Sequence, residues 1–393
     1  MVARIRRMWR FLCYFIGAEK TWRWPNPSEV VIFDAAGHDF LMAYLHPWEP
    51  EVLHVRGEKI NVPTLLQSLF RRGNKANAYI DCFIEKVRPR LIVTFIQNSF
   101  NFYLVSRRHS SAKTLFIQNG VQSYYCDVIE ILDAKAMPKS ALKVDYMLTF
   151  GSISGALYAR YMEGAVVPIG SLKNNMAPRR EKGSAGTIAF VSQYRNTQGL
   201  VLGEKFFSHQ EYFKRPDQIV LPFIANYARE NNKALLIIPC TRSSNGEPLE
   251  AEARYYNELL EHTCAFSKTS GPYAGYDAAD SAEVVVTIDS ALGYESAARG
   301  NKTAIFAIRS HLLSVAGLTF GWPENYPDDG SFWTNSPDTV AFGRILDHLF
   351  EIDEKQWIAE LKMLDFSSIM TYDPGNHILR SVLQKELNSL SSV

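Results

Sequence analysis

Polar side chains with the chemistry of an anion site follow three apolar runs in the carboxyl-terminal half of the chain. They occur in the segments Ser192-Gln193-Tyr194-Arg195, Cys240-Thr241-Arg242-Ser243 and Asp289-Ser290. Hydroxyl groups and guanidinium forks suit a phosphate or a sugar carboxylate, because the fork donates two parallel hydrogen bonds to a planar anion. A single arginine is more often a surface residue paired with a nearby acid. Two arginines and several hydroxyls at successive strand ends instead favour an anion site.

The third segment lies inside a predicted strand-helix-strand unit. The run 284–288 is apolar and β-branched, residues 291–299 have helical spacing before Gly300, and 303–308 is a second apolar run. A right-handed crossover places Asp289 and Ser290 at the end of a strand and the start of a helix. The free N–H groups and the helix dipole there suit a phosphate. The alternative is that Asp289 or Ser290 only caps the helix.

The composition limits the classes of protein to consider. The chain has 393 residues, 47% of them hydrophobic, which is enough for two domains with sizeable cores. A formal net charge of +1 argues against a general nucleic-acid binder. The five cysteines are odd in number and form no CxxC pair, so we expect neither a disulfide framework nor a zinc site. A cytoplasmic location fits this cysteine usage best.

Residues 1–28 form a basic, amphipathic segment in which arginines alternate with Trp9 and other apolar residues. We expect either a first helix packed on the body of the protein or a peripheral contact with the inner membrane, or with assembly proteins bound to it. The sequence contains no run of about 18 to 20 apolar residues that could span a bilayer. It also shows no cleavage site of a signal peptide.

The rest of the chain alternates strand-like and helix-like patterns, which is typical of an α/β protein. Residues 29–177 form a first domain, with strands expected at 30–33, 52–55, 90–97, 115–117, 146–150 and 166–170. Residues 178–186 are a polar linker. Residues 187–393 form a second domain, with strands expected at 187–191, 234–238, 265–268, 284–288 and 303–308, and its last helices could cross back to the first domain. We therefore predict two Rossmann-like, doubly wound domains facing across a cleft, with ligands at the carboxyl ends of the strands.

The order of motifs in the second domain resembles a known family. SQYR, PCTRS with EARYYNELL, VTIDSALGYESAARGNKTAIF, FGWP and DDGSFWTN follow one another between about residues 187 and 335. As a set they look like bacterial surface-carbohydrate biosynthesis proteins of the glycosyltransferase B superfamily, and most like the retaining β-Kdo transferases. The resemblance implies a glycosyltransferase that moves the acidic sugar Kdo from CMP-Kdo to a glycan acceptor of lipopolysaccharide, O antigen or capsule. The first domain is similar only in layout.

The turn at Asp289-Ser290 also resembles the DSGG-x-QE motif of non-hydrolysing UDP-N-acetylglucosamine 2-epimerases. By that resemblance, Ser290 and the Ala291 amide hold the donor phosphate and Glu295 holds the ribose. Ala291 and Leu292 stand where the epimerases have two glycines, so the backbone approaches a diphosphate less closely. A CMP-sugar has a single phosphate, which is compatible with this departure.

Retention by double displacement needs a carboxylate nucleophile in the cleft. The candidates are Asp127 and Glu130 after a Gln-Asn-Gly turn, and Glu204, Glu211 and Asp217 after the SQYR segment. His209 could assist proton transfer. Each of these residues could instead be a surface residue or a helix cap, and Asp217 directly after Pro216 fits the first turn of a helix.

Three further residues are candidate contacts with the acceptor sugar or the donor carboxylate. Gln118 and Asn119 belong to the Gln-Asn-Gly turn, and His38 follows the first predicted strand. The alternative for the first two is turn chemistry, because Asn-Gly is a favoured turn pair, and His38 could be a loop residue without a role.

We expect no metal and no other cofactor. CMP leaves as a monophosphate whose charge arginine and helix amides can neutralise. Asp328-Asp329-Gly330 invites a metal interpretation, but paired acids in loops are usually solvated turn formers. Two alternatives to a transferase stay open: a nucleotide-sugar epimerase or hydrolase of related fold, and a non-catalytic protein of envelope assembly.

Overall fold

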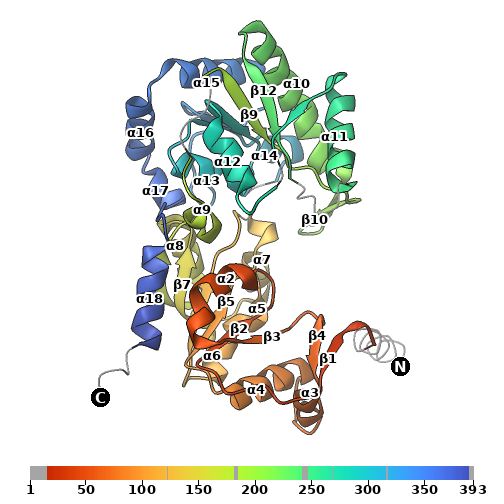
Figure 1. Ribbon diagram of the computed structural model, residues 1–393, viewed down its shortest axis with the longest axis vertical. Helices are drawn as coiled ribbons and strands as arrows, with labels where there is room; N and C mark the ends of the chain where they lie inside the picture. Colours follow the sequence, from red (N-terminus) through yellow and green to blue (C-terminus); the bar gives the residue numbers. More distant parts are fainter. Residues whose placement is uncertain are drawn as a thin grey trace.

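The computed structural model of the protein describes residues 16–121, 123–180, 185–240, 247–268, 270–315 and 317–388. These residues form two α/β domains stacked end to end (Figure 1). Each domain is built around a six-stranded parallel sheet. The predicted fold class, two Rossmann-like domains facing across a cleft, is confirmed.

The first sheet has the strand order β3-β2-β5-β6-β7-β8. Alternate residues of β2 pack on opposite faces, Val31 and Phe33 in one hydrophobic cluster and Val30 and Ile32 in another, as the two-residue period of a strand requires. Burial on both faces explains why these strands read as continuous apolar runs. The strands are β2 (Val30–Phe33), β3 (Glu51–Leu53), β5 (Leu91–Thr94), β6 (Lys113–Ile117), β7 (Lys143–Thr149) and β8 (Glu163–Pro168). The helices are α2 (His38–Leu45), α4 (Lys75–Val87), α5 (Phe100–Tyr103), α6 (Val105–Arg108), α7 (Ile129–Lys135), α8 (Ser152–Tyr161) and α9 (Leu172–Met176).

The second sheet has the order β13-β12-β9-β14-β15-β16, in which the first strand of the domain, β9, lies beside β14. This is the strand order of a dinucleotide-binding Rossmann fold, and the order reverses between β9 and β14. The strands are β9 (Thr187–Val191), β12 (Ala234–Ile238), β13 (Ala265–Phe266), β14 (Val284–Thr287), β15 (Thr303–Phe306) and β16 (Trp333–Thr334). The helices are α10 (Arg215–Glu230), α11 (Glu247–Leu260), α12 (Ala274–Ser281), α13 (Ala291–Ala298), α14 (Arg309–Leu313), α15 (Thr339–Glu351), α16 (Glu354–Met363) and α17 (Phe366–Ile369).

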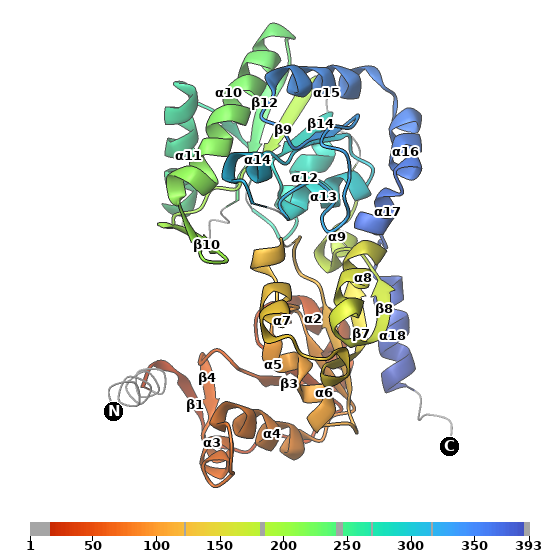
Figure 2. The same cartoon turned by 180° about the vertical axis from the view of Figure 1, so that it is seen from behind.

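Two smaller strand pairs lie outside the predicted alternation. β1 (Glu19–Thr21) pairs in parallel with β4 (Lys59–Asn61), which leads directly into α3 (Val62–Leu69). These elements form a lobe that projects from the first domain at the end far from the second domain (Figure 2). β10 (Gly199–Leu202) and β11 (Lys205–Ser208) form an antiparallel hairpin. Unlike the apolar runs of β2 and β14, β1, β4 and β11 are short and contain charged residues, so no strand pattern stands out in their sequence.

The end of the chain returns to the first domain. Helix α18 (His377–Leu387) packs Leu379, Leu383 and Leu387, spaced four residues apart, into the core beneath the first sheet. Arg90 donates hydrogen bonds to the carbonyls of Glu386 and Leu387 at 2.7 and 2.8 Å. The first domain is therefore completed by the last described helix.

Residues 1–15 of the predicted amphipathic segment lie outside the described residues. No helix in the described part of the chain is long and apolar enough to cross a membrane.

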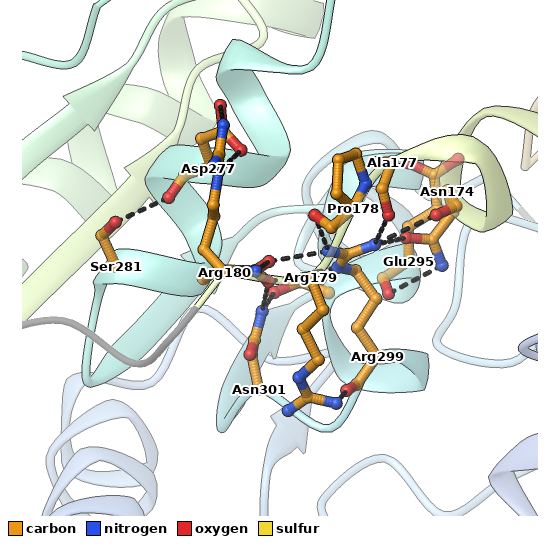
Figure 3. Close-up of polar contacts among 12 residues, drawn as sticks. Asn174, Ala177, Pro178, Arg179, Arg180, Asp277, Ser281, Glu295, Arg299 and Asn301 are labelled. Carbon is orange, nitrogen blue, oxygen red and sulfur yellow. Dashed lines mark hydrogen bonds and ion pairs between the residues drawn. The ribbon is translucent and has the colours of Figure 1, made fainter. Parts of the chain in front are cut away.

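A buried arginine joins the two domains where the chain passes between them. Arg299 follows α13 and Asp280 lies in α12; both side chains are nearly fully buried, and Arg299 Nη2 lies 2.6 Å from Asp280 Oδ2. The same guanidinium group donates to three main-chain carbonyls of the connecting segment, those of Asn174 at 3.0 Å, Ala177 at 3.2 Å and Pro178 at 3.1 Å (Figure 3). Arg299 thus holds the start of the predicted linker against the second domain. Residues 181–184 of that linker lie outside the described residues.

Replacing Arg299 with Ala should lower the free energy of unfolding by about 3–5 kcal/mol, because the change leaves the Asp280 carboxylate buried without its partner. Urea unfolding of the two proteins measures the difference. The control is Arg180→Ala, which removes an exposed ion pair with Asp277 from the same region and should change stability little. Equal losses in the two variants would contradict a special role for the buried pair.

Candidate functional site

A cleft of about 370 Å³ lies between the two domains. The carboxyl ends of four adjacent strands of the second sheet form one wall, which includes Ser192 after β9, Cys240 after β12, Ser290 after β14 and Arg309 after β15. The first domain forms the other wall, which includes Gln118 after β6, Asp127, Phe150 after β7 and Tyr158 of α8. The cleft therefore lies at the switch point of the second sheet, where open α/β sheets bind their ligands.

Arg309 is the buried cation of the second-domain wall. Its side chain is 1% exposed and forms an ion pair with Asp289. The guanidinium Nη1 also donates to Gln193 Oε1 at 2.8 Å, and Nε donates to the Tyr212 carbonyl at 2.9 Å. Burial alone would lower the pKa of Arg309, but Asp289, together with Tyr212 and Asp217, outweighs this effect and the pKa is raised. Nη2 is buried and has no hydrogen-bond partner among the described residues, so one donor of this cation is left for a ligand.

Ser290 occupies the N-cap position of α13, but its hydroxyl makes no capping hydrogen bond. Asp289 does not cap the helix either, because it is engaged with Arg309. The interpretation of these residues as simple caps is therefore not supported by the geometry. The Ser290 hydroxyl lines the cleft beside the first amides of α13, which by helix geometry lack partners within the helix.

A buried polar network supports the Ser192 turn from below. Ser192 Oγ donates to Glu252 of α11, and Tyr256 OH donates to Ser192 Oγ at 2.8 Å. Glu252 also accepts the Cys240 amide at 2.9 Å, so one carboxylate fixes the loops after both β9 and β12. Burying these groups is tolerable only because they are hydrogen-bonded to one another. The network gives the strand-end wall a fixed shape.

Asp217, in the first turn of α10, lies beneath the same wall and is 2% exposed. Its Oδ2 accepts hydrogen bonds from Tyr255 and Tyr256, each at 3.3 Å. Burial raises the pKa of Asp217 to about 7, although the charge of Arg309 opposes this shift.

Asp127 is the carboxylate of the first-domain wall. It is 7% exposed, lines the cleft and accepts a hydrogen bond from the hydroxyl of Tyr158. Burial raises the pKa of Asp127 to about 6, although the hydrogen bonds from Tyr158 and from the Val128 amide oppose this shift. A carboxyl group with a pKa near neutrality in a cleft has the properties of a general acid or base.

No curated protein matches the sequence significantly. Solved structures that resemble the chain include a variant of the wall teichoic acid polymerase TagF soaked with CDPG, with 11% identity over 92% of this chain and 89% of that chain and a TM-score of 0.48. A second is UDP-GlcNAc 2-epimerase from Neisseria meningitidis bound to UDP-GlcNAc, with 10% identity over 91% of this chain and 99% of that chain and a TM-score of 0.48. A third is a glycosyltransferase from Rickettsia africae, with 10% identity over 93% of this chain and 100% of that chain and a TM-score of 0.49. Likeness at this level says nothing about function.

A family model described as "putative O-antigen biosynthesis protein" matches residues 115–387, well over half of the chain. The chain belongs to this family. All the cleft residues described above lie within the matched region.

In this member of the family, the cleft brings together about half of the residues predicted from the sequence. Those that line it are Gln118, Asp127, Ser192, Gln193, Arg195, Asp289 and Ser290. Those that the structure places outside its lining are His38, Asn119, Glu130, His209, Glu211, Ala291 and Glu295. Thr241, Arg242 and Ser243 lie outside the described residues.

Glu295 is placed differently from its expected role as a ribose ligand. The side chain lies in the joint between the domains, where Ser171 donates to one carboxylate oxygen and Tyr276 donates to the other at 2.9 Å. The main-chain carbonyl of Glu295 accepts a hydrogen bond from Asn174 Nδ2 at 3.2 Å (Figure 3). Tyr294, one helical turn after Ser290, lines the cleft, whereas position 295 lies about 100° further around α13 and faces the first domain instead.

The other residues outside the lining have local partners. Glu211 accepts hydrogen bonds from the amide and hydroxyl of Ser208 at 2.8 and 2.7 Å, as a turn residue does. The amide of Asn119 donates to the side chain of Gln97 at 3.1 Å, which fits the turn alternative. Glu130 lies in the first turn of α7, and His209 stacks beside Phe213.

Three residues that line the cleft were not among those predicted from the sequence: Arg309, Tyr158 and Tyr212. Arg309 directly follows the predicted strand 303–308, and that strand lies next to the one that carries Asp289. An arginine at the end of a neighbouring parallel strand was the available signal. Nothing in the local pattern marks Tyr158 or Tyr212.

Within the described ranges, no group of three or more His, Cys, Asp and Glu side chains is arranged to hold a metal ion. The Asp328-Asp329 pair belongs to a local turn, because Asp328 accepts a hydrogen bond from Asn335 at 3.2 Å and Asp329 forms a β-bridge with Thr334. Activity without metal or cofactor stays a prediction.

The buried Asp217 should make the protein less stable as pH rises. Between its ordinary pKa of 3.8 and its folded value of about 7, the folded state keeps a proton that the unfolded state has released. Each unit of this difference costs about 1.4 kcal/mol, so a few kcal/mol are lost across that range. Asp217→Asn removes the titrating group, and its stability should fall less than that of the wild type between about pH 5 and 8.

Urea unfolding midpoints at the two pH values test this prediction. Asp277→Asn, at an exposed position of the same domain, is the matched control and should keep the wild-type pH dependence. If stability depended on pH in the same way in the wild type and in Asp217→Asn, the pKa of Asp217 would not be raised in the folded protein.

Proposed function

We propose that the chain is a cytoplasmic, retaining glycosyltransferase that transfers an acidic sugar, Kdo, from a CMP donor to a glycan acceptor of O-antigen, lipopolysaccharide or capsule type. The reaction breaks the bond between the anomeric carbon and the phosphate oxygen of CMP and forms a bond to an acceptor hydroxyl. The acceptor loses a proton, and CMP leaves with the electron pair of the broken bond.

One observation carries the donor side of this proposal. The buried Arg309 presents an unpartnered guanidinium nitrogen at the strand-end wall, beside the uncapped hydroxyl of Ser290 and the first amides of α13. A buried cation together with a helix amino terminus is a site for a phosphate that gains charge as it leaves. Arg195, exposed on the same wall, offers a second cation for the donor carboxylate.

The opposite wall supplies the carboxylate that the reaction requires. Among the acids predicted as nucleophiles, Asp127 lines the cleft and Glu130, Glu204, Glu211 and Asp217 do not. A pKa of about 6 leaves Asp127 mostly ionised at neutral pH, and Tyr158 fixes its orientation. We assign Asp127 to the reacting side as the nucleophile of a double displacement or as the base that takes the acceptor proton.

CMP should bind the purified protein and raise its melting temperature, whereas UDP should not. Ser290→Ala should weaken CMP binding by roughly tenfold or more, because a hydrogen bond to a charged phosphate is lost. Isothermal titration calorimetry measures the affinities, and thermal unfolding measures the melting temperatures. Ser281→Ala, on the exposed side of α12, is the control and should bind CMP as the wild type does. Preference for UDP would overturn the donor assignment, and equal affinity of Ser290→Ala would remove Ser290 from the site.

Turnover of CMP-Kdo should rise with pH through about 6, as Asp127 loses its proton. Asp127→Asn should lower turnover by about 10²–10⁴-fold with CMP affinity unchanged. In Tyr158→Phe the inflection should move to higher pH, because the hydrogen bond that lowers the pKa of Asp127 is gone. The pH dependence of kcat/KM measures both effects.

Glu130→Gln is the matched control for Asp127, three residues along the chain but outside the cleft, and it should keep wild-type turnover. Product analysis in the same assay separates the classes of reaction. Transfer to water or an epimerised nucleotide sugar, instead of transfer to a glycan, would assign the cleft to a hydrolase or an epimerase.

A further inference from the structure

Exposed apolar side chains concentrate on the small lobe of the first domain, formed by residues 16–25 and 56–75. Six of the thirteen large hydrophobic residues that are exposed in the described chain belong to it: Ile16, Trp22, Trp24, Leu66, Leu69 and Phe70. Phe70 is 90% exposed and Trp22 is 72% exposed. Isolated surface hydrophobics are ordinary, but a cluster of this kind marks an interaction surface.

Helix α3 presents the cluster on one face. Leu66, Leu69 and Phe70 are spaced three and four residues apart, so they lie side by side, while Val62 and Ser68 face the protein. β1 is tied to the start of this helix, because Asn61, the N-cap of α3, donates to the Arg23 carbonyl at 2.8 Å. The chain around Trp22, directly after β1, is therefore held next to α3.

The lobe is also basic, although Arg56 and Arg71 pair with Asp34 and Glu85 just outside it. Residues 16–25 and 56–75 contain seven Lys and Arg against two Glu, in a chain whose total formal charge is +1. Within the described ranges, Arg23, Arg72 and Lys75 make no ion pair with an acid. The fifteen residues before the lobe add four arginines and no acid.

We propose that this lobe docks on an anionic phospholipid bilayer, with Trp22, Leu66, Leu69 and Phe70 entering the interface and the surrounding cations facing lipid phosphates. Exposed aromatic and leucine side chains next to Lys and Arg suit the boundary between headgroups and acyl chains. A purely apolar protein partner would not require the excess of cations, whereas an anionic membrane surface does. The lobe lies at the end of the first domain far from the second domain (Figure 2), and none of its residues line the cleft, so docking leaves the cleft open.

Sedimentation of the full chain with vesicles tests the proposal. The protein should bind vesicles of phosphatidylcholine with phosphatidylglycerol, and bind phosphatidylcholine alone weakly. The double variant Leu69→Ser with Phe70→Ser and the double variant Arg72→Glu with Lys75→Glu should each bind anionic vesicles at least about tenfold more weakly. The matched control is Val340→Ser with Met363→Ser, which removes side chains of 77% and 84% exposure from the second domain and should bind as the wild type does.

Three results would overturn the proposal. The first is no binding of the wild type to anionic vesicles at low salt. The second is unchanged binding of the Leu69→Ser, Phe70→Ser variant together with complete loss when residues 2–15 are removed, which would place the anchor there. The third is a wild-type dimer that becomes monomeric in the Leu69→Ser, Phe70→Ser variant, which would assign the surface to a second copy. Unchanged melting of these surface variants confirms that each is folded.

Discussion

The buried pair of Arg299 and Asp280 is the interaction on which the arrangement of the two domains depends. Arg299 satisfies Asp280 and at the same time binds three carbonyls of the segment that leaves the first domain. A guanidinium group can do this because it has five donors in a fixed plane. An isolated charge at this depth would be costly, so the connecting segment and the second domain are each stabilised by the position of the other.

Helix α13 transmits this constraint to the cleft. Its first residue follows Ser290 in the strand-end wall, and Arg299 stands directly after its last residue. The helix has eight residues and is about 12 Å long. The Asp289-Ser290 turn and the Arg299 contacts between the domains therefore lie at the two ends of one short element. Glu295 lies between them and bonds to Ser171 of the first domain. Glu295, predicted as a ribose contact, instead ties α13 to the first domain.

The strands and their order along the chain could be predicted because each is a short apolar run that ends at polar residues, as β9, β12 and β14 do. The residues at those strand ends, Ser192 and Ser290, could be placed in the cleft for the same reason. Glu295 could not, because helical phase and the approach of the first domain decide which way it points. The strand-end position of Arg309 was available from the sequence, but its contacts with Asp289 after β14 and Gln193 after β9 depend on the strand order of the folded sheet. Strand adjacency is a property of the sheet and has no local signature.

The charges of the cleft are divided between its walls in a way that bears on the donor. Among its described lining residues, Arg195, Arg309 and Asp289 lie on the second-domain wall and Asp127 lies on the first-domain wall. Asp289 offsets one of the two arginines, so the second-domain wall has an excess of a single positive charge. The proposed CMP-Kdo donor carries two negative charges, one on its phosphodiester and one on the Kdo carboxylate, as many as the diphosphate of a UDP-sugar, so net charge does not separate the two donors. In the proposal the placement of the charges separates them, with Arg309 beside Ser290 toward the phosphodiester, Arg195 toward the donor carboxylate and Asp127 on the opposite wall.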